Sequence, residues 1–426
     1  MMSRRRDQVG KIRVLADRDH IYSRLGNLFQ QADDRYNSGL FHFKPEKGRH
    51  ESPDELTLNL ALDDNLLRGI LNSLYYPESP YVFSALPADM LGQVYEQFLG
   101  KVIRLTKGHH AKVDDKPEVK KAGGVYYTPT YIVEYIVENT VGKLVKDRTL
   151  RQAAKLKILD PACGSGSFLL GAYEFLLKWH LDFYVKSDPI KWAKGNKPVL
   201  VQTVGGSWKL TITERKRILL DNIYGVDIDA QAVETTKLSL LLKVLEGETS
   251  QTIQPELLHQ RALPDLGDNI KCGNSLIASD FFKHQQMTLF DEEERYHLNV
   301  FDWEREFADV FKAGGFDAVI GNPPWGSLLS EAELEYLRQQ NRSIIVRMID
   351  SFMYFVHQGS RKLNTRGYFG MILPDVILYQ IDNQKLREYI LDRFNIHEII
   401  NMGDIFKKVT RPSCILILGQ AVWSMK

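Results

Sequence analysis

Residues 156–168 read LKILDPACGSGSF. The apolar run over 156–160 predicts a short buried strand that ends in an acid. Gly164 and Gly166 let the backbone behind this strand turn tightly and approach a ligand, and the following residues predict a helix over 169–184. Because the start of a helix is electropositive, a strand, a glycine turn and a helix in this order are typical of α/β proteins that bind a ligand at the turn.

Strands and helices alternate from this stretch to the end of the sequence. Further strands are predicted over 222–229, 270–277, 316–321, 367–373, 396–400 and 413–418, with a small hairpin inserted over 199–213. Helices are predicted over 214–220, 350–360 and 386–394. This alternation predicts an α/β protein with one doubly wound sheet and with its ligands at the carboxyl edge of the strands.

The residues ahead of this region have a different pattern. They are predicted to be mostly helical up to about residue 107, with one apolar face after Asp63 and a second over 91–99. The polar segment 108–124 is bounded by glycines and is predicted to be a linker. We therefore expect a helical domain over 1–118 and a second domain over 119–426. The first apolar face consists of Leu66, Leu67, Ile70, Leu71 and Leu74.

Composition and charge exclude several classes of protein. The 426 residues are 44% hydrophobic and 26% charged, as in ordinary globular proteins, and the formal net charge of +1 gives no overall basic field for a nucleic acid. Cys163, Cys272 and Cys414 are isolated and lack metal-ligand spacing, which predicts reduced thiols, no metal site and a cytoplasmic protein. The apolar runs are too short to span a bilayer, so no membrane helix is expected.

Polar residues follow the predicted strands. Asp227 ends the strand after the glycine turn, where an acid can accept hydrogen bonds from both ribose hydroxyls of a nucleoside, and Ile228 can then pack on its base. Asn274 follows the next strand and offers a donor and an acceptor to a base edge. Thr128 is expected to cap the helix that begins near Pro129, whose N-terminus can hold a carboxylate.

A rigid corner ends the strand that begins at residue 316. Residues 322–325 read NPPW, and two successive prolines fix two φ angles and donate no N–H. The side-chain oxygen of Asn322 and the carbonyl of Pro323 can therefore accept both hydrogens of a planar amino group while Trp325 stacks on its ring. A turn with a packed tryptophan is the alternative interpretation of this motif alone.

Five motifs in order carry a family resemblance. They are YYTP (126–129), DPACGSGSF (160–168), GVDID (225–229), GNSL (273–276) and NPPW (322–325). This set resembles the gamma-class adenine-specific DNA methyltransferases, most closely the methylase part of type IIG restriction-modification enzymes, with kinship to type I modification subunits. The resemblance covers residues 120–426 and implies a Rossmann-like fold for S-adenosylmethionine-dependent methyl transfer. Residues 86–96 also resemble the helical connector that precedes the methylase in type IIG chains.

The resemblance implies roles for individual residues. It assigns the methionine part of S-adenosylmethionine to Thr128 and the loop that contains Asp160, Ala162, Gly164 and Gly166. It assigns the rest of the cofactor pocket to Phe168, Asp227, Ile228, Asn274, Leu276, Asn322 and Phe352. Asn322 and Pro323 would bind the target amino group, with Trp325 on one face of the flipped base and Phe406 on the other. Two departures are present: tryptophan replaces the commoner tyrosine at 325, and Asn274 stands where many relatives have aspartate.

The predicted function is site-specific methylation of the 6-amino group of adenine in double-stranded DNA, in a prokaryotic restriction-modification system. Two acceptors would localise the amino lone pair toward the methyl group, so positioning would supply most of the rate. The alternatives are methylation of protein glutamine or RNA guanine, whose nitrogen is also planar, and a non-catalytic DNA-binding subunit. Since relatives continue into a target-recognition domain, a recognition domain or specificity subunit outside this sequence is expected to be a further partner.

Overall fold

A computed structural model describes most of residues 128–421, with gaps at 204, 249–262, 284–297, 328, 346, 348–349 and 407–410. Ahead of them it describes residues 17, 19–36, 43, 54–75, 78–79, 90, 101–106, 108 and 110–115. The chain divides into two compact units, Met1–Met90 with Leu245–Leu266, and Leu91–Val244 with Gly267–Lys426. The predicted boundary after residue 118 and the predicted apolar face over 91–99 lie outside the described residues.

The first unit contains two helices that pack on each other, α2 (Ile21–Tyr36) and α3 (Asp64–Ser73), and the short 3-10 helix η1 (Thr57–Asn59). The carboxylate of Asp63 caps α3, as its sequence predicts, and that of Asp64 accepts hydrogen bonds from the backbone at the start of α2. Only part of the predicted apolar face is buried. Leu67 and Leu71 pack on Ile21, whereas Leu66, Ile70 and Leu74 are exposed.

A β-hairpin corrects two predictions. Strand β1 (Lys101–Leu105) pairs antiparallel with β2 (Ala111–Asp115), so residues 101–105 are not helical and the predicted linker begins with a strand. The reason is local: the β-branched residues in Lys-Val-Ile-Arg-Leu favour a strand, and residues 106–110 close a turn in which the N–H of Thr106 donates to the carbonyl of His110.

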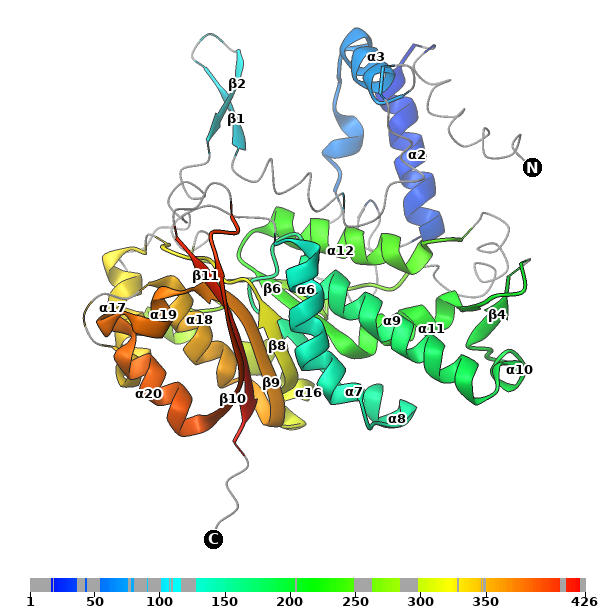
Figure 1. Cartoon of the computed structure of the whole chain (residues 1–426). Coiled ribbons are helices and arrows are strands. Elements are labelled where there is room, and N and C mark those ends of the chain that lie inside the picture. The colour runs from blue at the N-terminus through cyan, green and yellow to red at the C-terminus, as the bar shows by residue number, and fades with distance from the viewer. Residues whose placement is uncertain are drawn as a thin grey trace. The chain divides into compact units, whose positions relative to one another are not determined.

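The second unit is built on a seven-stranded sheet of order β10-β11-β9-β8-β3-β6-β7 (Figure 1). Strands β9, β8, β3, β6 and β7 are parallel, and β11 runs antiparallel to both of its neighbours. The strands span β3 (Ile158–Asp160), β6 (Ile223–Asp227), β7 (Ile270–Cys272), β8 (Phe316–Gly321), β9 (Leu363–Pro374), β10 (Phe394–Gly403) and β11 (Ser413–Gln420). The predicted α/β sheet is confirmed. From β3 the chain passes to β6 and β7 on one side and then returns to β8 on the other, so a crevice opens at the carboxyl end of β3.

Helices cover both faces of this sheet (Figure 1). Helix α6 (Thr130–Val137), the π-helical turn η3 (Glu138–Gly142) and α9 (Ser167–Ser187) contact the strands from one side, and α18 (Ser351–Ser360) and α20 (Gln384–Arg393) from the other. The remaining elements are α7 (Lys143–Val145), α8 (Leu150–Ala153), α10 (Pro189–Trp192), α11 (Ile212–Asn222), α12 (Ala230–Leu245), η4 (Ser279–Lys283), α15 (Trp303–Glu306), α16 (Ala308–Lys312), α17 (Glu331–Gln340), η6 (Arg342–Ile344), α19 (Val376–Tyr379) and η7 (Ile381–Asn383). The predicted hairpin is also present, as β4 (Leu200–Gln202) paired with β5 (Trp208–Leu210).

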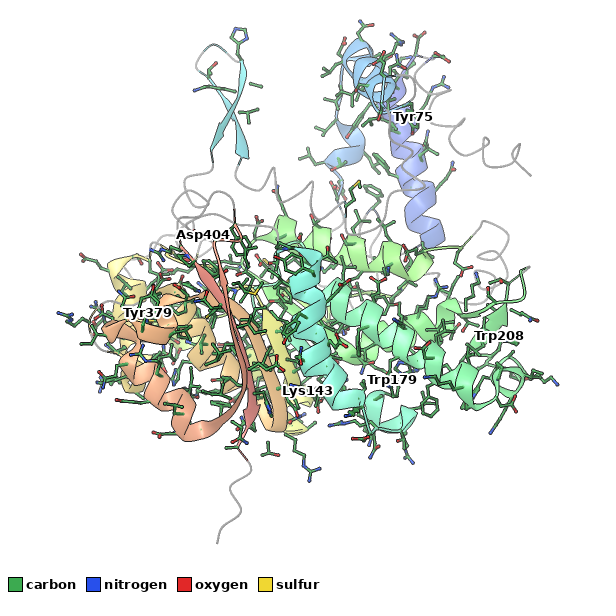
Figure 2. All side chains as sticks on the ribbon, viewed as in Figure 1. Tyr75, Lys143, Trp179, Trp208, Tyr379 and Asp404 are labelled. Carbon is green, nitrogen blue, oxygen red and sulfur yellow. The ribbon has the colours of Figure 1, made fainter. Side chains whose placement is uncertain are left out.

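One polar contact fastens the first of these helices to the edge of the sheet. Lys143, labelled in Figure 2, lies 3.3 Å from the carboxylate of Glu398 on β10, and the hydroxyl of Tyr135 on α6 donates to the same carboxylate. Helix α6 therefore contacts both the centre and the edge of the sheet.

Among the described residues, none of the helices combines the length and the apolar character that a membrane span requires.

Gly166 begins α9 and is expected to be sensitive to substitution. Its φ is +87°, and an added Cβ would lie 2.8 Å from Cγ2 of Thr236. We expect Gly166→Ala to lower the free energy of unfolding by about 2–4 kcal/mol, through backbone strain and overpacking together. The matched control is Gly206→Ala in the β4–β5 turn, where φ is +83° but the added Cβ meets no atom within 4 Å.

The control variant carries the strain alone and is expected to lose about 1 kcal/mol. Urea unfolding of the two variants and the parent measures the cost of the backbone strain and the cost of the contact with Thr236 separately. Equal losses at the two positions would show that the contact with Thr236 relaxes freely.

Candidate active site

The carboxyl ends of three adjacent strands place polar side chains at one edge of the sheet. Asp160 ends β3, Asp227 ends β6, and Asn322 directly follows β8. Because these strands are parallel, their ends meet at the crevice beside β3. The sequence places the same residues at strand ends, and the structure confirms that arrangement.

The glycine loop after β3 is held by hydrogen bonds from two neighbouring elements. The N–H of Gly164 donates to Oδ2 of Asp227 at 2.8 Å, and the hydroxyl of Thr236 on α12 donates to the carbonyl of Gly164 at 2.8 Å. The N–H of Cys163 donates to the carbonyl of Val226. The loop is thus fixed against β6 and α12, and its shape does not depend on a ligand. Thr236 was not predicted, because nothing in its helical pattern marks it.

Asp160 is buried beneath this loop. Its side chain is 1% exposed, and its Oδ1 accepts from the N–H of Ala162 at 3.0 Å. Gly321 packs directly against the carboxylate: φ there is +154°, and an added Cβ would lie 2.6 Å from Oδ1. Burial, and the neighbouring Asp227 after it, raise the pKa of Asp160 to about 8.

Asp227 is a second acid in the same crevice and is partly buried. Its Oδ2 accepts from Gly164 and its Oδ1 from the N–H of Asp229 at 2.9 Å, yet burial still raises its pKa to about 6. Within the described residues neither Asp160 nor Asp227 forms an ion pair. A buried and a partly buried carboxyl group without a basic partner favour a cationic or hydroxyl-rich ligand.

Thr128 does not cap a helix, which corrects the prediction. The N-cap of α6 is Pro129, and no side-chain hydrogen bond caps it. The Thr128 hydroxyl instead accepts from the side-chain N–H of Asn322 at 3.2 Å, and Thr128 is 4% exposed. With the amide nitrogen of Asn322 turned toward Thr128, its carbonyl oxygen is left to accept from another group.

Three residues that the sequence did not single out fasten the turn after β8. Asp350 accepts from the N–H of Gly326 at 2.6 Å through Oδ1 and from Arg411 at 2.6 Å through Oδ2. The hydroxyl of Ser351 donates to the carbonyl of Pro324 at 2.6 Å. In the sequence, Asp350 and Ser351 have the pattern of an ordinary helix start, so their contacts with the turn carry no local signal.

The two predicted stacking residues lie side by side. The rings of Trp325 and Phe406 have centroids 5.6 Å apart and planes at 80°, an edge-to-face contact. The indole nitrogen of Trp325 is buried and has no hydrogen-bond partner within the described residues. The two rings are thus in contact, but they are not parallel.

The remaining predicted residues surround the same strand ends with different exposure. Leu276 belongs to a buried cluster against which Ala162 packs, and Asn274 accepts from the N–H of Leu276 at 3.1 Å. Phe168 and Phe352 are buried, at 3% and 1% exposed, whereas Ile228 is 53% exposed and presents a free apolar surface next to Asp227. Tyr126 and Tyr127 lie outside the described residues.

A part of the chain that includes residues of this site matches the model of a known protein family. Residues 221–406 match the family model described as Eco57I restriction-modification methylase, and this range contains Asp227, Asn274 and the turn at 322–325. The chain contains an Eco57I restriction-modification methylase domain. The predicted resemblance is therefore confirmed.

Curated relatives agree with this domain. The chain is 31% identical over 410 residues to the type II restriction enzyme and methyltransferase RM.Eco57I of Escherichia coli, which covers 94% of this chain and 37% of the relative. It is 25% identical over 213 residues to the adenine-specific methyltransferase PglX of Streptomyces coelicolor, which covers 48% of this chain and 15% of the relative. The chain thus spans well under half of the length of these relatives.

A solved structure shows the same fold. A cryo-electron microscopy structure of a DrdV–DNA complex matches with a TM-score of 0.54 and 14% identity, over 94% of this chain and 36% of that one. The methylase domain therefore has the α/β fold with a mostly parallel central sheet that the sequence predicts.

Asp350 is expected to position the turn of the methylase domain without touching the reacting atoms. Asp350→Ala removes both hydrogen bonds that hold Gly326 and Arg411, so Trp325 gains freedom and kcat is expected to fall about 10–100-fold. Binding of S-adenosylhomocysteine should stay within about twofold of the parent, because the cofactor residues are untouched.

The control for this prediction is Arg411→Ala. Arg411 is 49% exposed, and its removal leaves the contact between Asp350 and Gly326 in place, so a change in kcat below about threefold is expected. Single-turnover methylation with each variant measures the difference. Parental turnover in Asp350→Ala would rule out the positioning role.

Proposed function

We propose that this methylase domain transfers the methyl group of S-adenosylmethionine to the 6-amino group of adenine in DNA. The observation that carries the proposal is Asn322, whose amide nitrogen is engaged by Thr128 while its oxygen lies at the end of β8, followed by two prolines and Trp325. The printed names of two relatives, a type II restriction enzyme and methyltransferase and an adenine-specific methyltransferase, support the same substrate.

The described residues fit the cofactor. S-adenosylmethionine supplies a methyl group on a sulfonium and carries an ammonium and a ribose. Asp160 is buried and Asp227 partly buried, and neither has a basic partner among the described residues, so one can hold the ammonium and the other the ribose hydroxyls. Ile228 offers its exposed side chain to the adenine ring of the cofactor, and Asn274 and Leu276 lie after the neighbouring strand. Gly164 and Gly166 leave the loop free of side chains where the backbone must approach.

The turn at 322–325 positions the substrate amino group. Its two hydrogens are accepted by Oδ1 of Asn322 and by the carbonyl of Pro323, which moves the nitrogen lone pair out of conjugation with the ring. The bound cofactor would supply the methyl group to this lone pair, and the amino group would lose one of its two protons to solvent afterwards. No strong base is required, because positioning supplies most of the rate.

The base must leave the duplex to reach this turn, at a cost of a few kcal/mol. Trp325 and Phe406 now contact each other edge to face. We propose that the entering adenine separates the two rings and stacks between them, which offsets part of the cost of unstacking. Without DNA, each of the two rings buries part of the surface of the other.

The domain organisation belongs to the same proposal. We assign residues 1–118 to the connector and 119–426 to the catalytic domain, although the hairpin β1–β2 belongs to the second compact unit. We expect a target-recognition domain or specificity subunit as a further partner. The helices of the first unit support the assignment of a helical connector. The net charge of +1 supports a further partner that contributes to DNA binding.

The test offers S-adenosylmethionine with a labelled methyl group to DNA, RNA and protein from a host without this system. We expect label in N6-methyladenine of DNA after complete nuclease digestion. Label in guanine of RNA or in glutamine of protein would overturn the substrate assignment, and the absence of cofactor binding in calorimetry would overturn the enzyme assignment.

A further inference from the structure

A second pocket lies apart from the proposed active site. It has a volume of about 300 Å³ and is lined by three arginines from different elements, Arg342, Arg361 and Arg393, around His357 and Tyr389. None of the residues that line it is acidic. None of the residues assigned above to the cofactor or to the base lines it either.

The topology separates this pocket from the active site. Helix α18 begins at Ser351, beside the turn after β8, and its ten residues span about 15 Å. Arg361 follows its last residue and precedes β9, and Arg393 ends α20 directly before β10. Both strands begin at the amino edge of the sheet, so the arginines lie at the edge opposite the catalytic turn.

The charge in the pocket is uncompensated. Within the described residues no carboxylate lies within 4 Å of Arg342, Arg361 or Arg393, although the guanidinium of Arg393 lies 5.2 Å from the centre of the Tyr389 ring. Cations near helix C-termini are common, because they complement the helix dipole. All three arginines are exposed, so solvent screens part of the repulsion between them, and an anion bound between them removes the remainder.

The floor of the pocket is neutral and preorganised. His357 is 4% exposed, and its Nδ1 lies 2.7 Å from Oδ1 of Asn341, whose amide nitrogen donates to the carbonyl of Leu337. The side-chain oxygen of Asn341 therefore faces His357 as an acceptor, and Nδ1 of His357 carries the hydrogen. The other ring nitrogen, Nε2, lies 3.4 Å from the hydroxyl of Ser343. Burial, and the charges of Arg361, Arg393 and Lys362 after it, lower the pKa of His357 to about 4. The imidazole therefore stays uncharged beside the arginines.

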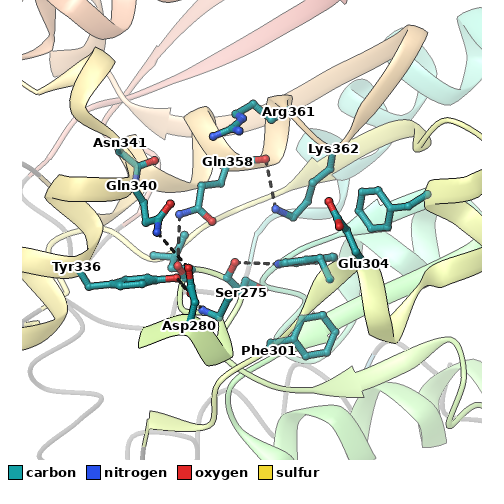
Figure 3. A pocket seen from close by; sticks show the side chains of 14 residues that line it. Ser275, Asp280, Phe301, Glu304, Tyr336, Gln340, Asn341, Gln358, Arg361 and Lys362 are labelled. Carbon is teal, nitrogen blue, oxygen red and sulfur yellow. Dashed lines mark hydrogen bonds between the residues drawn. The ribbon is translucent and has the colours of Figure 1, made fainter. Parts of the chain in front are cut away.

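An adjoining cavity of about 270 Å³ shares Gln340 and Arg361 with the arginine pocket (Figure 3). Aromatic rings and amide groups line it, including Trp303, Tyr336 and Gln358, together with the carboxylates of Asp280 and Glu304. The Nζ of Lys362 lies 4.4 Å from the centre of the Trp303 ring. Flat apolar surfaces with amide groups between them suit a planar heterocycle that forms hydrogen bonds along its edge.

We propose that the arginine pocket binds the phosphate of a nucleotide whose base enters the adjoining cavity. A guanidinium presents paired N–H donors that match phosphate oxygens, and three of them here can surround one phosphate. Arg361 lines both cavities and so joins the phosphate to the rest of the ligand. The arginine pocket shares no residue with the proposed cofactor and base sites, whereas the adjoining cavity borders the cofactor pocket through Leu276.

The test is calorimetric titration of the whole chain with AMP, with inorganic phosphate and with adenosine. Saturating S-adenosylhomocysteine is present throughout, so that AMP cannot occupy the cofactor site. We expect AMP to bind at least about tenfold more tightly than phosphate or adenosine, and to bind more weakly as salt rises. Arg361→Ala and Arg342→Ala should each weaken AMP at least about tenfold.

The matched control is Arg338→Ala. Arg338 is an exposed arginine on α17 that lines neither cavity, so its removal changes net charge alone and should leave AMP binding within about twofold of the parent. Thermal unfolding of each variant shows that it folds. Absence of AMP binding, or equal weakening by all three substitutions, would overturn the site, and equal affinity for phosphate and AMP would overturn the nucleotide assignment.

The arginine pocket could bind a backbone phosphate of DNA in place of the phosphate of a free nucleotide. If Arg361→Ala weakens binding of a DNA duplex and leaves AMP binding unchanged, the pocket contacts the DNA backbone and the proposal is wrong. Because this readout is binding with the cofactor site filled, it does not depend on whether methyl transfer occurs, and its failure is distinct from failure of the proposed function.

Discussion

Replacement of Asn322 by alanine is expected to lower kcat for methyl transfer by about 10²–10³-fold while the cofactor still binds. The variant loses one of the two acceptors that hold the amino group, and the lone pair stays conjugated with the ring. It also loses the hydrogen bond of 3.2 Å that the amide nitrogen donates to Thr128, the residue before the N-cap of α6. Single-turnover rates and the Kd of S-adenosylhomocysteine separate the two effects.

Asn322→Asp is the matched control for this loss. Aspartate has the same shape and keeps an acceptor oxygen, and Thr128 can then donate its hydroxyl hydrogen to the second oxygen. We expect Asn322→Asp to retain at least about ten times the rate of Asn322→Ala. If the two variants were equally slow, the contribution of Asn322 would be its donor to Thr128 and not its acceptor.

The regular part of the fold follows from the sequence because its signals are local. Short apolar runs that end in Asp160, Asp227 and Asn322 mark strands, and parallel strands bring their carboxyl ends together without further information. The hairpin β1–β2 was missed for the opposite reason. Residues 101–105 continue a segment predicted to be helical, and the polar residues 111–115 resemble a linker, so neither strand shows its partner in its own pattern.

Contacts between distant residues explain the other corrections. Thr128 before a proline has the local pattern of a helix cap, but its partner Asn322 lies 194 positions away in the chain. Asp350 and Arg411 are 61 positions apart, and the arginine pocket gathers residues from three separate elements. Such pairs have no periodic or spacing signal, so tertiary packing alone assigns them.

Replacement of Asp160 by asparagine is expected to weaken S-adenosylhomocysteine by about 30–1000-fold, the loss of a buried charge partner. Asparagine keeps an oxygen that can accept from Ala162 but cannot carry the negative charge that an ammonium requires. Gly206→Ala, in the distant β4–β5 turn, is the control that should bind normally. A Kd within about threefold of the parent for Asp160→Asn would remove Asp160 from the cofactor site.

The raised pKa of Asp160 gives this prediction a dependence on pH. Without ligand its pKa is about 8, so below that pH the carboxyl group is protonated and the ammonium must displace a proton to bind. Affinity is therefore expected to rise with pH between about 6 and 8, by up to about tenfold per pH unit, and to level off above about 8. Calorimetry in buffers of different ionisation enthalpy counts the released proton, and Asp160→Asn should release none from this position.

The stability of the ligand-free protein should change in the opposite direction. The native pKa of Asp160 lies above the ordinary value near 3.8, so the native state holds a proton that the unfolded chain has lost between about pH 4 and 8. The free energy of unfolding therefore falls as pH rises through this window. Asp160→Asn removes this term, and at pH 8 the variant should unfold at higher urea concentration than the parent. If Asp160→Asn raises the free energy of unfolding and weakens S-adenosylhomocysteine, then the buried acid lowers the stability of the ligand-free protein and contributes to ligand binding.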